Sequence, residues 1–129
     1  MTGRHDTTRA VAHFLGGFTA AEGTFVRSEV PRPSGPGRPT FTFAVSLGSV
    51  DISSCELFRT FLGVGQVRRY PRRKPGNDDE VVFSIRSIPK LLEVVVPFMD
   101  EHLPPSHKRQ QYLAWREELV SYDEVRRRP

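Results

Sequence analysis

The fold of this chain is decided by the segment FLGGFTAAEGTF, residues 14–25. Apolar residues at i, i+3, i+4 and i+7 predict an amphipathic helix from about residue 7, with the core-facing stripe Val11, Phe14, Leu15 and Phe18. Small residues on another face would let a second backbone approach closely: Ala12, Gly16, Gly17, Ala20 and Ala21. Glycines inside a helix destabilise it by about 1 kcal/mol each, so we expect close packing there, either within the chain or against a second copy.

The expected helix ends on a carboxylate. Glu22 falls in its last turn, and Gly23 suits the left-handed position that often follows a helix. A negative charge at a helix C-terminus opposes the helix dipole by roughly 0.3–1 kcal/mol. A bound cation or a positively charged partner would remove that conflict, whereas a solvated surface acid is the simpler alternative.

The motif LGGFTAAEG, residues 15–23, resembles the defining motif of the LAGLIDADG homing endonucleases. Leu15 matches the first leucine of that motif, Gly17 its glycine, Glu22 its metal-binding acid and Gly23 its closing glycine. Ala20 departs from the pattern, because the family often has an acid there. The later acid, here Glu22, carries the metal chemistry in the family, so the active site would remain.

The resemblance implies both a fold and an activity. The fold is α+β, an αββαββα unit in which an antiparallel saddle-shaped sheet carries its helices on one face. The activity is site-specific cleavage of double-stranded DNA by hydrolysis with a divalent cation, Mg²⁺ or one such as Mn²⁺. Glu22 and a main-chain carbonyl, that of Ala21, would hold the metal together with DNA phosphates.

A chain with one motif supplies only half of such a site. The resemblance therefore implies a homodimer with an isologous interface and a near-palindromic target. The small-residue stripe would form that interface: Ala12, Gly16, Gly17, Ala20 and Ala21.

The composition indicates a single cytoplasmic domain. A chain of 129 residues with 37% hydrophobic content can bury one modest core, so we expect one domain over 1–129 with flexible tails at 1–6 and 124–129. Cys55 is the only cysteine, which excludes an internal disulfide and a zinc site of several cysteines. No segment has the pattern of a signal peptide or a membrane span, and we expect neither membrane association nor a small-molecule substrate.

The net charge of +4 is unevenly distributed. Residues 1–76 carry eleven Lys and Arg against five Asp and Glu, whereas residues 77–125 carry five against ten. The basic excess peaks in one cluster: Arg68, Arg69, Arg72, Arg73 and Lys74. Such a cluster can neutralise nucleic-acid phosphates, although a solvated turn is the alternative.

Further along the chain the periodicity alternates between strands and helices. Strands are predicted over 24–30, 40–47, 66–70 and 80–86, and helices over about 53–62, 88–96 and from 106 onward. Asp51 or Ser53, Ser87 and Ser106 are the expected N-caps. Pro97 is expected to bend or end the second of these helices. The resulting order is αββαββα with one additional helix at the end.

If the apolar faces of the strands pack under the helices, the opposite sheet face is polar. A polar antiparallel ribbon can enter a major groove, although it can also simply face water. In the family this face reads DNA, and the resemblance thereby assigns DNA contacts to Ser28, Thr40, Thr42, Ser46, Gln66, Arg68, Tyr70, Arg72, Arg73, Lys74, Ser84 and Lys108.

Two further positions concern catalysis. Arg86 is similar in place to a basic residue that borders the family's active site, where a cation would stabilise the charge that develops on phosphate. Its alternative is a surface arginine at a strand end. Many single-motif members have a glutamine near the end of the second strand, where this chain has Leu47. Ser46 or Ser49 are the possible substitutes.

Two alternatives to the endonuclease remain open. One is a LAGLIDADG protein that no longer cleaves but binds nucleic acid, as an intron-RNA splicing helper or a regulator; Ala20 and Leu47 favour it and Glu22 opposes it. The other is an unrelated α+β dimerisation module.

Overall fold

The computed structural model describes residues 3–71 and 79–128. Its elements follow one another as α1 Gly3–Glu22, β1 Gly23–Val30, β2 Arg38–Gly48, η1 Ser49–Asp51, α2 Ile52–Leu62, β3 Gln66–Tyr70, β4 Glu80–Ile85, α3 Ile88–Lys90, η2 Leu91–Val95, α4 Val96–His102 and α5 His107–Arg127. This is the predicted order, with every predicted strand present. Helices extend into both expected tails, because residues 3–6 belong to α1 and residues 124–127 to α5.

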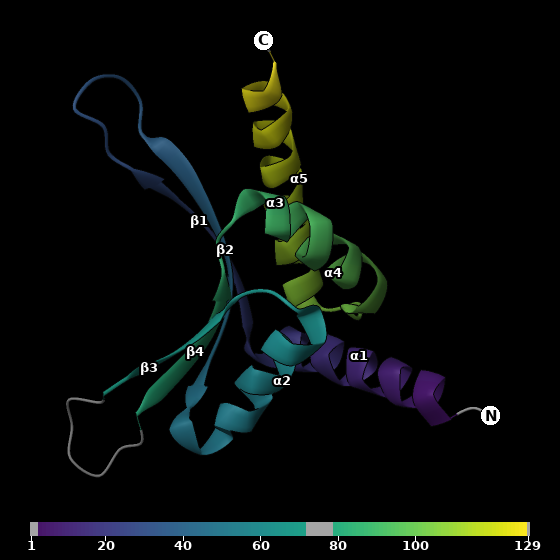
Figure 1. Ribbon diagram of the computed structural model, residues 1–129. Coiled ribbons are helices and arrows are strands. Elements are labelled where there is room, and N and C mark those ends of the chain that lie inside the picture. The colour runs from purple at the N-terminus through teal and green to yellow at the C-terminus, as the bar shows by residue number, and fades with distance from the viewer. Residues whose placement is uncertain (1–2, 72–78, 129) are drawn as a thin grey trace.

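The four strands form one antiparallel sheet in the order β1-β2-β4-β3. Figure 1 shows the helices gathered on one side of this sheet, while the β1–β2 pair and the β3–β4 pair extend outward on the other. The strand alternation is as predicted, because every second residue of β2 and β4 is buried under the helices: Phe41, Phe43, Val45, Val81, Phe83 and Ile85. The opposite face is left open.

Helix α5 packs across the sheet through Tyr112, Trp115 and Leu119, all buried. The Trp115 indole Nε1 donates to the main-chain oxygen of Val26 in the edge strand β1, at 3.1 Å. The Tyr112 hydroxyl donates to a carboxylate oxygen of Asp100 at 2.6 Å, and burial together with this contact raises the pKa of Tyr112. These bonds fix α5 against both the sheet and α4.

The serine caps are confirmed, and the segment around Pro97 differs from expectation. Ser87 Oγ accepts from the amide of Lys90, and Ser106 Oγ accepts from the amide of Arg109 at 3.1 Å.

Pro97 does not end the helix, which passes through the π-helical turn η2 and continues as α4 to His102. The wider turn accommodates a ring that lacks an N–H and would otherwise clash with the carbonyl one turn earlier. None of the helices described is both long and apolar enough to cross a membrane.

The packing of α1 differs from the prediction in its rotation about the helix axis. Ala12, Leu15, Gly16 and Thr19 are buried, whereas Phe14, predicted to face the core, is 50% exposed. Gly16 contacts the main-chain carbonyl of His102 at the end of α4 so closely that a Cβ would overlap it. Gly16 therefore packs within the chain, and Phe14 lies on the exposed face, where small residues such as Gly16 were expected.

Candidate nucleic-acid interface and active site

The open face of the sheet carries the side chains predicted for it. The register aligns Thr24, Ala44, Ser84 and Gln66 in one row across the four strands. The next row on the same face contains Ser46, Val82 and Arg68. Arg68 Nε donates to Gln66 Oε1 at 3.0 Å, so these two side chains hold each other in place. The face thus combines hydroxyls, an amide and the Arg68 guanidinium with the small apolar side chains of Ala44 and Val82. The β1–β2 and β3–β4 pairs diverge from each other on this side (Figure 1).

Glu22 ends α1 at one end of this face and is exposed. The next residue, Gly23, pairs with Val45, so the carboxylate lies at the end of the sheet where Ser46 is found. Gly23 is not left-handed as expected; its lack of a side chain admits Thr19, whose Cγ2 would stand 2.6 Å from a Cβ. The close approach of Thr19 joins α1 tightly to β1 and fixes the position of Glu22.

A second carboxylate on this face was not predicted. Glu80 is the first residue of β4, and its Oε2 accepts a hydrogen bond from Ser46 Oγ at 2.7 Å. Its only signal in the sequence is an acid at the start of a predicted strand. Glu80 places a fixed acceptor among the donors of the open face, near the end where Glu22 lies.

Glu22 is the carboxylate that the motif predicts as a metal ligand, and it is exposed at the end of α1. The last carbonyls of a helix lack partners within the helix, so the Ala21 carbonyl could serve as a second oxygen ligand beside the Glu22 carboxylate. Hard divalent cations prefer such oxygens. Within residues 3–71 and 79–128, however, no three His, Cys, Asp or Glu side chains lie together as a metal site.

Lys108 lies in a groove of about 550 Å³ between the edge of β1 and α5. Thr24, two residues beyond Glu22, lines the same groove together with Gln111. Lys108 therefore lies beside the edge of β1 near its Glu22 end, on the side of the sheet that α5 covers. Its contact with DNA stays a prediction.

Arg86 lies just beyond the end of β4, two strands away from the start of β1, and its role beside the active site stays a prediction. It follows Ile85, which pairs with Phe43, whereas Gly23 pairs with Val45. At about 3.3 Å per residue and about 4.8 Å per strand, Arg86 is roughly 14 Å from the start of β1. Too far from Glu22 to touch it in the same copy, Arg86 instead borders two grooves at the end of β4.

The side chain of Leu47 faces the helices. It is partly buried and packs against the core, opposite Val81. Ser46 is its neighbour on the open face and is held by Glu80. The place where many single-motif members have a glutamine therefore holds a leucine turned toward the helices.

The structure divides the predicted interface stripe. Ala12 and Gly16 are buried within the chain and Ala20 packs partly against its core, so Ala12 and Gly16 are wrong as interface residues. Gly17 and Ala21 are exposed, and nothing lies within 4 Å of a Cβ built at Gly17. The available face of α1 thus comprises Gly17 and Ala21 together with Phe14.

The predicted basic cluster is only partly described. Arg68 lies on the open face, and Arg69 points to the other side, where its Nε meets Asp79 Oδ2 at 2.9 Å. Arg72, Arg73 and Lys74 lie outside the described residues. Ser28, Thr40 and Thr42 lie on the open face toward the far end of β1 and β2, and Tyr70 lies opposite Glu80.

A four-stranded antiparallel sheet with its helices on one side and an acid-ended helix leading into its first strand is the fold of the LAGLIDADG homing endonucleases. The sequence profile described as LAGLIDADG endonuclease matches residues 15–119, and this chain belongs to that family. Family membership excludes the second of the two alternatives to the endonuclease, an unrelated α+β dimerisation module.

Solved structures of the family superpose on most of the chain. Meganuclease I-SmaMI bound to uncleavable DNA is 16% identical with a TM-score of 0.78, over 89% of this chain and 38% of that one. I-LtrWI bound to its target DNA is 20% identical with a TM-score of 0.76, over 88% and 37%. I-TnaI is 22% identical with a TM-score of 0.76, over 88% and 74%.

This chain thus spans less than two fifths of the length of I-SmaMI and I-LtrWI. A search of curated protein sequences found no match.

Proposed function

We propose that this chain is a homing endonuclease that cleaves both strands of a long, near-palindromic DNA target as a homodimer. The observation that carries the proposal is the exposed carboxylate of Glu22, which a family-defining motif places where α1 meets the polar face of the sheet. Family membership and the fold support the proposal.

The open face suits the major groove of DNA. That groove is about 12 Å wide and admits a two-stranded ribbon. Gln66 and Arg68 offer an amide and a guanidinium to base edges, while Ser28, Thr40 and Thr42 offer hydroxyls to bases or phosphates. Because Arg68 is already oriented by Gln66, less side-chain entropy would be lost on binding.

Glu22 and the Ala21 carbonyl would hold Mg²⁺ or Mn²⁺, with phosphate oxygens completing the ligand set. The metal, when bound, supplies the activation of water and the stabilisation of the leaving oxygen. Lys108, beside the edge of β1 near Glu22, can place its positive charge near a phosphate as negative charge develops during cleavage.

A homodimer would complete the site. One chain provides one motif carboxylate, and the exposed face of α1 with Phe14, Gly17 and Ala21 is the surface on which a second copy would bring another Glu22 close. A two-fold pairing of identical surfaces matches a target with two similar halves.

One specific observation favours a second candidate, a nucleic-acid-binding LAGLIDADG protein without cleavage, acting as an intron-RNA splicing helper or a regulator. Leu47 faces the core, so no side chain at that position can order solvent near the metal. Such a protein would bind without cutting in any divalent cation.

The test is a comparison of the unaltered protein with Glu22→Gln, using a duplex selected from a random library by binding in Ca²⁺. In Mg²⁺ we expect the unaltered protein to cleave the duplex and Glu22→Gln to lose activity by orders of magnitude. Binding should persist or strengthen, because a negative charge leaves a surface that faces phosphates. Glu56→Gln, which removes one exposed carboxylate on α2, is the matched control.

Cleavage by Glu22→Gln at the rate of the Glu56→Gln control would contradict the proposal. Binding without cleavage by the unaltered protein in both Mg²⁺ and Mn²⁺ would favour the second candidate.

A further inference from the structure

Two histidines lie side by side where α1 packs against the end of α4. His13 belongs to α1, and His102 is the last residue of α4. Their ring centroids are 5.7 Å apart, and the rings are nearly perpendicular, at 88°. The main chain maintains this spacing, because Gly16, three residues after His13, packs directly against the carbonyl of His102. The two imidazoles therefore stay close as long as both helices keep their places.

The ring of His102 is largely buried, and one of its nitrogens has no partner. The side chain is 17% exposed, and Nδ1 is buried without a hydrogen-bond partner among the described residues. The other nitrogen, Nε2, lies 3.6 Å from a carboxylate oxygen of Glu101. A carboxylate beside Nε2 favours the tautomer whose proton is on that atom, which leaves the lone pair on Nδ1. A buried nitrogen without a partner destabilises a fold, and a bound water or ion is its usual partner.

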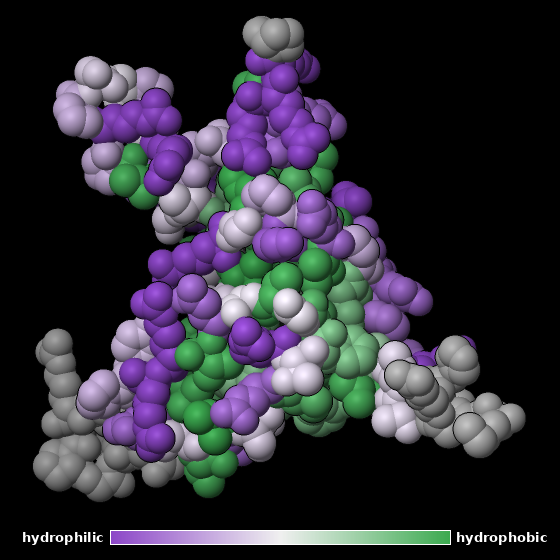
Figure 2. Space-filling view, viewed as in Figure 1, coloured by the Kyte–Doolittle hydropathy of each residue, from purple (hydrophilic) through white to green (hydrophobic). Residues whose placement is uncertain are grey.

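The surroundings of His102 are apolar. The Phe98 ring lies 5.0 Å from that of His102 and 6.0 Å from that of Phe61. Figure 2 shows hydrophobic residues gathered over the middle of the molecule, where α2 and α4 lie in Figure 1. Of the two rings that contact His102, those of Phe98 and His13, the ring of His13 carries a nitrogen lone pair. A ligand between the two histidines would lie at the border of an apolar shell, which limits access of solvent.

We propose that His13 and His102 bind a transition-metal ion such as Zn²⁺ or Ni²⁺, with water in the remaining positions. Imidazole suits Zn²⁺, Cu²⁺ and Ni²⁺, whereas Mg²⁺ prefers oxygen ligands. With a metal–nitrogen bond of about 2.0–2.1 Å and roughly 1.1 Å from the nitrogen to the ring centre, two tetrahedral imidazole ligands have centroids about 5.2 Å apart. The observed separation of 5.7 Å is close to this value. His13 is exposed, so its ring can turn about its side-chain bonds toward the ion.

This ion would be separate from the proposed catalytic metal. His13 and Glu22 are nine positions apart in α1. At about 1.5 Å per residue, this places them roughly 14 Å apart along the helix, too far to share one ion. An ion at His13 would instead link α1 to α4 and stabilise the folded chain, because the unfolded chain does not hold the two imidazoles together. The inference is therefore independent of the proposed cleavage of DNA.

The experiment titrates the full chain, without an affinity tag, with Zn²⁺ and with Ni²⁺ in a buffer that contains excess Mg²⁺ to occupy oxygen sites such as Glu22. Calorimetry measures binding, and thermal unfolding measures stability. A saturating concentration of either ion should raise the Tm by about 5 °C. His13→Ala should weaken binding by about tenfold or more and abolish this rise, because one of two ligands is lost. His107→Ala removes an exposed histidine from α5 and is the matched control, which should behave like the unaltered protein.

A second measurement examines His102 without a substitution in the packed end of α4. In nuclear magnetic resonance spectra, paramagnetic Ni²⁺ should broaden the ring signals of His13 and His102 at a lower concentration than that of His107. The proposal is wrong if neither ion raises the Tm, if His13→Ala binds like His107→Ala, or if the His107 signal broadens first. Each of these results would leave the proposed endonuclease function standing, because Glu22 takes no part in the site.

Discussion

Gly16 and Gly17 are adjacent in α1, but their surroundings are opposite. A Cβ at Gly16 would stand 2.8 Å from the carbonyl carbon of His102 and 3.2 Å from its Cβ, whereas a Cβ at Gly17 would meet nothing within 4 Å. One face of the helix therefore packs against α4 inside the chain. The other face presents Phe14, Gly17 and Ala21 to the outside, and Glu22 follows at its end.

Gly16 and Gly17 therefore have separate roles although they are adjacent in one helix. Gly16 is needed for the fold of a single chain, because only a residue without a side chain lets α1 and α4 approach so closely. Gly17 has no such role in the single chain, although glycine weakens a helix by about 1 kcal/mol relative to alanine. Contact with a second copy is the role that we propose for it.

The largest effect expected from this comparison is on stability. Gly16→Ala should lower the free energy of unfolding by about 3 kcal/mol, because the new methyl group overlaps main-chain atoms that cannot easily move. Gly17→Ala should leave it unchanged or raise it by up to about 1 kcal/mol. Urea unfolding of both variants at a low protein concentration measures the two values. Equal losses for the two variants would contradict the assignment of faces.

Two phenylalanines one turn apart sharpen the same contrast. Phe18 packs against Phe58 with ring centroids 5.9 Å apart, so Phe18→Ala should destabilise the single chain by about 2 kcal/mol. Phe14 is half exposed and its ring contacts that of Phe18, so Phe14→Ala should cost less than about 1 kcal/mol. The same urea measurement applies. Phe14→Ala should additionally weaken self-association, as sedimentation at increasing concentration would detect.

The smallest expected effect concerns the open face. Glu80→Gln keeps an acceptor for Ser46 but removes a negative charge from the face that we propose for DNA binding. Non-specific duplex binding should therefore strengthen, by roughly threefold at low salt, while the base preference near that residue changes. Selection of bound duplexes from a random library compares the two preferences. Identical preferences would mean that Glu80 serves only to hold Ser46.

The sequence was most informative where a pattern has one solution. The alternation in residues 40–47 and 80–86 determined which face of β2 and β4 is buried, because a period of two leaves no other choice. In α1 it was less informative, since Val11, Ala12, Phe14, Leu15 and Gly16 place small or apolar residues on most of the helix surface. The rotation of α1 was then decided by its fit against α4, which no local pattern encodes.

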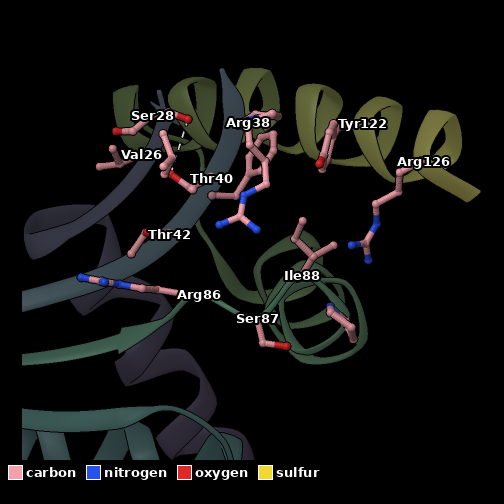
Figure 3. A pocket seen from close by; sticks show the side chains of 14 residues that line it. Val26, Ser28, Arg38, Thr40, Thr42, Arg86, Ser87, Ile88, Tyr122 and Arg126 are labelled. Atoms are coloured by element: carbon pink, nitrogen blue, oxygen red, sulfur yellow. Dashed lines mark hydrogen bonds between the residues drawn. The ribbon is translucent and has the colours of Figure 1, made fainter. Parts of the chain in front are cut away.

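Site residues could be predicted where the motif fixed them, as for Glu22. The distance of Arg86 from Glu22 could not be predicted, because it depends on the strand register and on where β4 ends. Glu80 was missed because only the register reveals that it points to the same face as Ser46. Arg38 and Arg126 line one hollow between β2 and α5 (Figure 3) although they are 88 positions apart in the sequence, so only the fold brings them together.

In the proposed homodimer, the exposed face of α1 joins two copies so that the two Glu22 residues meet. Cross-linking tests it directly, because Cys55 is the only cysteine and is buried, which raises the pKa of its thiol and suppresses its reaction. Glu22→Cys and, as a control, Thr60→Cys on the exposed side of α2 are treated with a short bis-maleimide.

Glu22→Cys should give a covalent dimer of about twice 14.7 kDa, and Thr60→Cys should remain monomeric. If Glu22→Cys reacts fully with a single-headed maleimide yet yields no dimer with the bis-maleimide, the two residues do not meet and the account of a shared site is wrong.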